Sequence, residues 1–394
     1  MRNRKWLFYL VTAIFWFSLY TYVPYVAPFA REMGASYRLV GLIGGAYGFT
    51  QMVIRFPLGI FSDKIGRRKI FVQLGLLFAA AAGTLVFFLP SPNSLLLARA
   101  FGGVAASSWV TFTVLGASYF PPDKTTKSMG YLSACNAAGR MVAALAGGLI
   151  AQQLGVEHAF LLGGIFGITG LFIGFGIVEK RVSGNIEPPI EISSENSPSF
   201  AELLNVAKNK QLLSCSVLAI LSMFVAFATT FSFTPLAAAH LDAGNFQIGM
   251  LLVVSTVPGI FMAPLAGTIM PQKLGAAATI VIGFLLAGLG SALVAVSRTL
   301  LELFIVQIIS SVGGAILGTL LLGLCIRDIA PPRRAAAMGF FQAVYGIGMF
   351  LGPFVTGQIS HAFGLSPAFI FTGIIGLVGA VLTIFYARKG YLAY

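Results

Sequence analysis

The chain has 394 residues, of which 57% are hydrophobic and only 9% are charged, and its mean hydropathy is +0.90. A soluble globular domain carries about 25% charged residues, so this composition excludes a cytosolic enzyme, a disordered chain and a secreted disulfide scaffold. The formal net charge is +13, but the basic residues lie in short clusters between apolar stretches. That pattern indicates membrane topology signals rather than a nucleic-acid-binding face, so we expect a lipid bilayer as partner and no nucleic acid.

Twelve apolar stretches dominate the chain, and each is long enough for a membrane-spanning helix of about 20 residues. The expected spans are 6–30, 39–61, 70–90, 94–118, 128–152, 158–178, 212–237, 246–269, 275–296, 300–326, 335–360 and 366–387. These runs lack the alternating pattern of a membrane barrel, so the expected fold class is an all-α integral membrane protein. The first stretch is too long for a signal-peptide core and has no small-residue cleavage site, so we expect it to remain a helix.

The basic residues are divided unequally between the two sides of these spans. Of the 25 Lys and Arg residues, 19 lie on the side of the N-terminus and only Arg31, Arg38 and Arg298 lie on the other side. Cytoplasmic loops carry the excess of Lys and Arg, so both termini are predicted to be cytoplasmic. The short loops suit a bacterial inner membrane, and we expect a multi-pass protein of the plasma membrane.

The two halves of the chain repeat each other at an offset of 209 residues. The matching pairs include Gly139 with Gly348, Gly148 with Gly357, Gly164 with Gly373 and Phe160 with Phe369. A constant offset at the half-chain spacing indicates a parallel duplication of six spans. We therefore expect two six-helix bundles, at 1–180 and 211–394, joined by a cytoplasmic linker at 181–210 that is rich in Pro, Ser and Glu.

The segment after the second span carries a motif of glycines and charges. Its key residues are Gly59, Asp63, Lys64, Gly66, Arg67, Arg68 and Lys69. Here the chain resembles the major facilitator superfamily, whose signature is a Gly, an Asp four residues later and then Lys/Arg-x-Gly-Arg-Arg/Lys. Length, span count and duplication extend the resemblance to the whole chain.

This resemblance implies two pseudo-symmetric bundles around a central cavity, secondary transport by alternating access, and a cytoplasmic gating latch made by the motif. The residues support a latch because Asp63, at the membrane rim, can accept hydrogen bonds from Arg67 or from a helix N-terminus. A topology anchor made of positive charges is the alternative.

Two further segments resemble motifs of the same family. In span four, Arg99 precedes a Gly-rich face, which implies a part in proton coupling, although Gly102 stands where the family has a polar residue. Span five has the glycine spacing of the antiporter motif but carries Ala143 and Ala144 in place of its Gly-Pro pair. Helix packing is expected at Gly130, Gly139, Gly148, Gly348, Gly352 and Pro353.

Three arginines within spans are the most informative candidates for a binding site. They are Arg55, Arg99 and Arg140, and no Asp or Glu lies deep in any span. An arginine at mid-bilayer costs roughly 2.5–3.5 kcal/mol on insertion scales, so it usually faces a cavity or a partner. A bound carboxylate or phosphate is a suitable partner for Arg140, and less so for Arg99. Arg140 can instead bond backbone carbonyls or waters, and Arg55 can extend toward the cytoplasm.

Other polar and aromatic residues complete the predicted substrate-binding set. They are Asn136, Tyr20, Tyr22, Gln51, Gln307, Gln342 and Tyr345. Each alone more often makes a helix–helix hydrogen bond than a ligand contact. Trp16 and Trp109 can stack on an aromatic substrate or face lipid.

No enzyme site, cofactor site or metal site is expected. The three histidines are far apart in sequence, the three cysteines have no paired spacing, and there is no nucleotide-binding loop. We expect a monomeric transporter of a small-molecule substrate, namely an organic anion, and protons stay open as a coupling ion. The alternative is a proton-coupled multidrug efflux antiporter, and lipid flipping is a third possibility.

Overall fold

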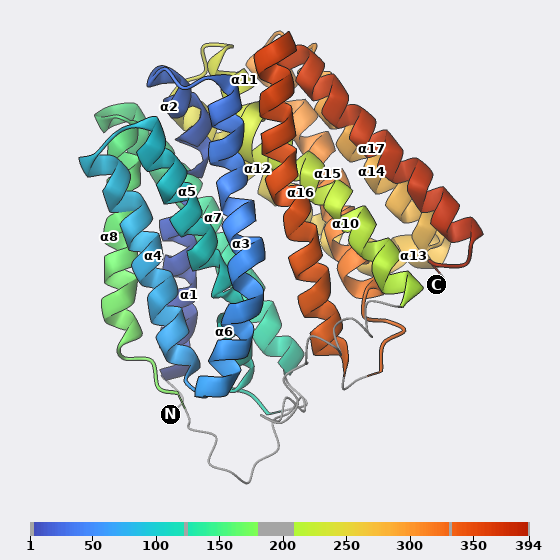
Figure 1. Ribbon diagram of the computed structural model, residues 1–394, viewed down its shortest axis with the longest axis horizontal. Helices are drawn as coiled ribbons and strands as arrows, with labels where there is room; N and C mark the ends of the chain where they lie inside the picture. The colour runs from blue at the N-terminus through green and yellow to red at the C-terminus, as the bar shows by residue number, and fades with distance from the viewer. Residues whose placement is uncertain (1–3, 122–124, 180–208, 331–332, 393–394) are drawn as a thin grey trace. The chain divides into compact units, whose positions relative to one another are not determined.

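The computed structural model describes residues 4–121, 125–179, 209–330 and 333–392, and within these ranges the chain forms helices and no strand (Figure 1). The helices of the first part are α1 (Arg4–Tyr20), η1 (Val23–Tyr25), α2 (Val26–Glu32), α3 (Tyr37–Ile65), α4 (Arg68–Phe88), α5 (Pro92–Ser107), α6 (Trp109–Ala117), α7 (Thr125–Leu154) and α8 (Val156–Gly174). Those of the second part are α10 (Lys210–Ala228), η3 (Thr229–Phe233), α11 (Thr234–Ala239), α12 (Asn245–Gly267), α13 (Ile269–Leu274), α14 (Ala276–Val294), α15 (Leu300–Leu324), α16 (Arg334–Phe363) and α17 (Leu365–Arg388).

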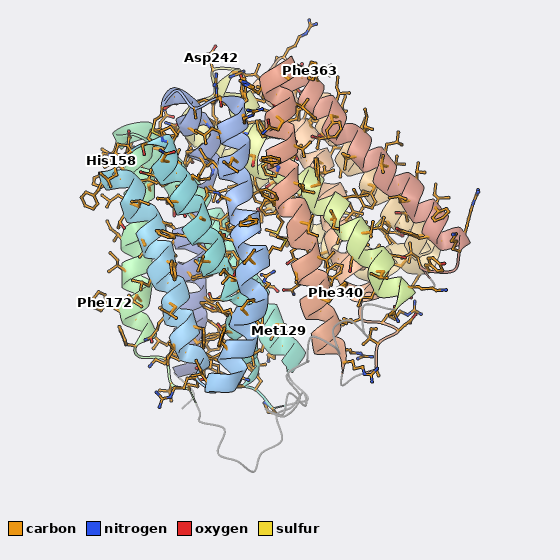
Figure 2. The ribbon with its side chains drawn as sticks, viewed as in Figure 1. Met129, His158, Phe172, Asp242, Phe340 and Phe363 are labelled. Atoms are coloured by element: carbon orange, nitrogen blue, oxygen red, sulfur yellow. The ribbon has the colours of Figure 1, made fainter. Side chains whose placement is uncertain are left out.

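Eleven segments of the described chain are long and apolar enough to cross a membrane. They correspond to eleven of the twelve expected spans, and the expected fold class is confirmed. The twelfth expected span, 39–61, lies in α3, which has 29 residues but also carries polar and charged groups such as Gln51 and Arg55. Large apolar side chains stand exposed on the outside of the helices, among them Phe172 and Phe363 (Figure 2). A hydrocarbon solvent explains that exposure.

The described residues divide into two compact units. The first lies within Met1–Val23 and Thr50–Ser197, and the second lies within Pro24–Phe49 and Pro198–Tyr394. The expected division near residue 180 is not the only one. α2 and the first half of α3 precede it in the sequence but belong to the second unit. The expected linker at 181–210 lies, apart from its last two residues, outside the described residues.

Glycines set the closest helix crossings within each unit. In the first unit, a Cβ atom on Gly83 of α4 would lie 2.5 Å from the backbone nitrogen of Gly164 in α8. In the second unit, a Cβ atom on Gly376 of α17 would lie 2.5 Å from the Cα atom of Gly288 in α14. Membrane helices come this close through small residues, since lipid tails supply no hydrophobic force between helices. The two crossings join corresponding pairs of helices in the repeat, α4 with α8 and α14 with α17.

The first half of α3 packs tightly against α16 in the second unit. A Cβ atom on Gly41 would lie 2.5 Å from the carbonyl oxygen of Pro353, and one on Gly48 would lie 2.5 Å from the carbonyl carbon of Met349. Nearby, Arg38 Nε donates a hydrogen bond to Gln358 Oε1 at 2.7 Å. The glycines at 41 and 48 are therefore required for this approach, because any larger residue collides with the α16 backbone.

The helix that begins with α10 widens into a π-helical turn, η3, before it continues as α11. Pro235 has no N–H group, and its ring would clash with the carbonyl four residues earlier in a regular helix. The wider π turn removes this conflict. Gln307 of α15 stabilises the π turn, because its Nε2 donates a hydrogen bond to Thr230 Oγ1 at 2.9 Å.

Candidate functional site

Arg140 lies near the middle of α7, a helix of 30 residues. Its guanidinium carbon lies 4.4 Å from the ring centroid of Tyr20 in α1, which is a cation–π contact. Tyr20 is buried and Arg140 is half-buried. The structure therefore brings together two of the predicted binding residues.

The crossing of α1 and α7 explains the position of Arg140. A Cβ atom on Gly139 would lie 2.5 Å from the carbonyl oxygen of Ala13 and 3.2 Å from Cβ of Trp16. Only glycine permits that approach, so its neighbour Arg140 is held against the face of α1 that carries Trp16 and Tyr20. Residues four apart share one helix face, so those two rings lie one turn from each other.

Tyr20 belongs to a chain of aromatic rings that continues through Trp16 to Trp109. The Tyr20 and Trp16 ring centroids are 5.7 Å apart, and those of Trp16 and Trp109 are 5.3 Å apart at an interplanar angle of 71°. Trp16 is only 6% exposed, and its buried Nε1 atom has no hydrogen-bond partner among the described residues. Trp109 is half-buried.

A break between α5 and α6 positions Trp109. The Ser108 hydroxyl donates to the Ala105 carbonyl at 2.6 Å, and the Ser107 hydroxyl donates to the Gly103 carbonyl at 2.9 Å. Such bonds from serine back to the preceding turn compete with the helical ladder and bend helices. Gly75 of α4 leaves room for Ser108, because a Cβ atom there would collide with its hydroxyl.

Arg99 and Tyr22 form a second, deeper pair in the first unit. Arg99 is 4% exposed, and its charge acts on the Tyr22 hydroxyl. Tyr22 is fully buried and stacks on Phe160, with ring centroids 4.5 Å apart. Arg55 and Gln51, one turn apart on α3, are also buried. All three intramembrane arginines thus lie in the first unit, and Arg140 is the least buried of them.

The predicted residues of the second unit have different surroundings. Gln307 is buried and holds the π turn, as described above. Tyr345 lines a pocket of about 200 Å³ between α10, α15 and α16, together with Ser222, Met223 and Phe341. Gln342, on the preceding turn of α16, is half-buried, and so is Asn136, one turn before Arg140 on α7.

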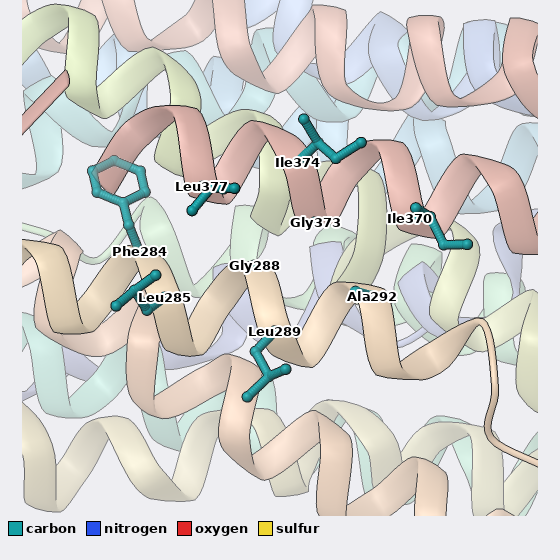
Figure 3. A pocket seen from close by; sticks show the side chains of 9 residues that line it. All are labelled: Phe284, Leu285, Gly288, Leu289, Ala292, Ile370, Gly373, Ile374 and Leu377. Atoms are coloured by element: carbon teal, nitrogen blue, oxygen red, sulfur yellow. The ribbon is translucent and has the colours of Figure 1, made fainter. Parts of the chain in front are cut away.

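An apolar groove of about 240 Å³ lies between α14 and α17 (Figure 3). Its lining residues are Phe284, Leu285, Gly288, Leu289, Ala292, Ile370, Gly373, Ile374 and Leu377. None of these side chains can hydrogen-bond. The groove therefore suits hydrocarbon and has nothing to orient a polar solute.

The motif at 59–69 spans the end of α3 and the start of α4. Gly66 has φ +66°, a left-handed conformation that glycine adopts without strain and that ends α3. The side chains of Asp63 and Lys64 lie outside the described residues, so the predicted latch is a proposal. A Cβ atom on Gly59 would meet no described atom within 4 Å, so this glycine is not at a close crossing.

Glu179, which sequence reasoning missed, binds the start of α4. Its carboxylate accepts the backbone N–H groups of Arg68 at 2.7 Å and Lys69 at 3.1 Å, as suits an anion at a helix N-terminus. Tyr119 donates to the Val178 carbonyl at 2.8 Å. Burial, and then the Glu179 carboxylate, raise the pKa of Tyr119, so its phenol stays protonated as a donor. The sequence signal for this capping role is an acidic residue, Glu179, just after the sixth expected span.

The predicted packing residues differ in their contacts. Besides Gly139, a Cβ atom on Gly348 or Gly352 of α16 would collide with the α10 carbonyls of Ile220 or Phe224. Gly148 is buried. The backbone of Pro353 lies against Gly41 of α3. A Cβ atom on Gly130 would meet no described atom within 4 Å, so close helix packing does not account for this glycine.

Comparisons with known proteins agree with this architecture. The model of a family described as Major Facilitator Superfamily matches residues 8–297 and 217–391. An uncharacterized MFS-type transporter of Methanocaldococcus jannaschii is 25% identical over 91% of this chain and 92% of its own length. The multi-drug resistance efflux pump PmrA of Streptococcus pneumoniae is 24% identical over 91% of this chain and 89% of its own length.

A similar solved structure is a bacterial homolog of the human lysosomal transporter Spinster in an inward-facing, occupied conformation. It has a TM-score of 0.81 and 15% identity, and the match covers 98% of this chain and 96% of that chain. At this identity the likeness is one of fold, and the fold is that of membrane transporters.

Proposed function

The chain belongs to the Major Facilitator Superfamily, and from this premise we propose that it carries a small organic anion across the membrane by alternating access. The family makes it a multi-pass membrane transporter of a small-molecule substrate. In the proposal, bundles at 1–180 and 211–394 rock about the site, and both termini are cytoplasmic. The single observation that supports an anionic cargo is Arg140, half-buried at mid-helix with its guanidinium over Tyr20.

The stacked geometry suits an anion for a physical reason. A guanidinium that lies over an aromatic face still presents its N–H groups in its own plane, where a carboxylate or phosphate accepts two parallel hydrogen bonds. In the low dielectric of the membrane interior, a positive charge attracts an anion more strongly than it does in water. Every acidic residue of the sequence lies near a span end or in a connecting segment, so the local charge balance favours a negative solute.

Transport measurements on arginine variants test the proposal. In proteoliposomes, Arg140→Gln is expected to lower transport of an organic anion at subsaturating concentration by about tenfold to 100-fold, the loss of one charged hydrogen-bonding group. Arg140→Lys keeps the charge but loses the paired N–H donors of the guanidinium, so an intermediate loss of transport is expected. Arg298→Gln, at an exposed arginine of the second unit, is the control. Unchanged anion transport in Arg140→Gln would falsify the proposal.

A second candidate is a proton-coupled multidrug exporter, which is favoured by the similarity to a relative named as a multidrug efflux pump. Exporters of cationic drugs commonly need an acid in the cavity, and the spans here hold none at depth. Transport of a lipophilic cation in the same proteoliposomes, driven by a pH gradient at zero voltage and insensitive to Arg140→Gln, would favour this candidate.

A further inference from the structure

Two of the three tryptophans of the chain continue the row of aromatic rings that starts at Tyr20, the ring under Arg140, and the anion-binding role uses neither of them. Trp16 is one turn from Tyr20 on α1, and Trp109 meets Trp16 edge to face. The third, Trp6, is half-exposed near the start of α1. The indoles therefore add two aromatic surfaces and two N–H donors to the neighbourhood of one guanidinium.

The buried indole N–H of Trp16 points to a missing acceptor. Trp16 is 6% exposed, and its Nε1 has no hydrogen-bond partner among the described residues. Buried donors in native proteins are nearly always paired, because an unpaired one loses its hydration without compensation. An oxygen-bearing ligand next to Arg140 supplies such an acceptor.

Trp109 is held so that part of its indole stays accessible. Its ring lies over Phe112, with centroids 6.1 Å apart and planes 27° apart. Phe112 is fully buried and packs in turn on Phe15 at 4.8 Å. A half-buried indole with a fixed, buried support is a preorganised surface on which a flat ring can stack.

We propose that the solute is an aromatic carboxylate. Its carboxylate binds Arg140, one of its oxygens accepts the Trp16 N–H, and its ring stacks on Trp109. This inference rests on the proposed anion transport and narrows its substrate class. A ring–ring contact adds about two- to tenfold in affinity beyond burial of the same area, so an aromatic acid binds more tightly than a saturated ring acid of similar size.

Tryptophan fluorescence of the full chain in detergent measures this binding directly. In Trp6→Phe, both remaining indoles belong to the cluster, so any quenching reports on it. The probes are benzoate, 2-naphthoate and cyclohexanecarboxylate. We expect saturable quenching by the two aromatic acids, with affinities about two- to tenfold above that of the saturated acid.

Variants of Trp109 and Arg140 separate the ring contact from the charge contact. In Trp109→Leu, the preference for aromatic acids, measured by thermal shift, is expected to disappear while cyclohexanecarboxylate still binds. Trp109→Phe restores part of the preference, which shows that the ring rather than folding is responsible. Arg140→Gln weakens all three acids alike.

The outcomes distinguish this inference from the proposed function. Equal affinities for the saturated and aromatic acids, or an unchanged preference in Trp109→Leu, overturn the aromatic class and leave anion transport standing. Binding of all three acids that is indifferent to Arg140→Gln overturns the anion site itself. Absence of saturable quenching by either aromatic acid also overturns the inference.

Discussion

At the scale of single residues, the positions of Arg140 and Glu179 have different origins. Arg140 is placed by the glycine before it, since Gly139 allows α7 to touch α1 at Ala13. Glu179 is placed by the end of the sixth span, and it satisfies two N–H groups that the first turn of α4 leaves open. Arg140 is costly to bury and is the residue on which the proposed binding site rests, whereas Glu179 stabilises a helix start.

Removing the charge of Glu179 is expected to destabilise the protein moderately. Glu179→Gln keeps one acceptor oxygen but loses the attraction to the helix N-terminus, and Glu179→Ala loses both. The expected cost is about 0.5–2 kcal/mol, larger for Ala than for Gln, as for other helix caps. Apparent melting temperature in detergent measures the effect. Asp328→Asn, at an exposed acid, is the control, and an equal shift in that variant would contradict the capping role.

At the scale of helices, α3 is the element that departs most from its expected form. Its first half packs on α16 in the second unit, while its residues from Thr50 onward lie in the first unit. One helix thus contributes to both compact units. In the proposed alternating access, with bundles at 1–180 and 211–394, α3 and α16 belong to different bundles, so their contact is expected to separate once in each transport cycle.

A reversible cross-link between α3 and α16 is therefore expected to stop transport. Arg38 and Gln358 are hydrogen-bonded at 2.7 Å, so cysteines at these two positions are within reach of a short bifunctional thiol reagent. In a cysteine-free background, the cross-linked double variant is expected to lose more than about nine-tenths of its transport. When the linker contains a disulfide, its reduction is expected to restore transport. Each single variant treated with the same reagent is the control. Full activity of the linked protein would show that this contact stays closed during transport.

At the scale of the whole molecule, much of the fold can be predicted from the sequence because a bilayer imposes strong rules. The span lengths, the absence of strands in the described chain and the matched glycines at 164 and 373 all follow from composition and periodicity. The expected span at 39–61 lies within α3, whose glycine-rich face packs against α16.

The candidate site was less predictable, for reasons of geometry. Arg140 and Tyr20 stand out in the sequence as polar groups within spans, but 120 positions separate them, and only the α1–α7 crossing shows their contact. The pairing of Gln307 with Thr230 depends on the π turn, whose sole sequence signal is Pro235. The unsatisfied N–H of Trp16 has no signal in the sequence, because it depends on what surrounds the ring.

The unequal basic charge predicts the orientation of the molecule in the membrane. A cysteine at Arg298 is expected to react with a membrane-impermeant maleimide in intact cells, while one at Lys389 reacts only after the membrane is opened. Both native side chains are exposed, so reagent access rather than burial decides the outcome. A cysteine-free parent is the control. Labelling of the Lys389 variant in intact cells would contradict the predicted cytoplasmic C-terminus.

The duplication allows Arg140 in the first half to be compared with its counterpart in the second half. At the offset of 209, Arg140 corresponds to Met349, a buried and neutral side chain, although the glycine before each is kept. The two copies have thus diverged in chemistry while they kept the same backbone crossing. If Arg140 binds the cargo as proposed, the first half alone selects the sign of its charge, and the second half can change in shape without altering that selectivity.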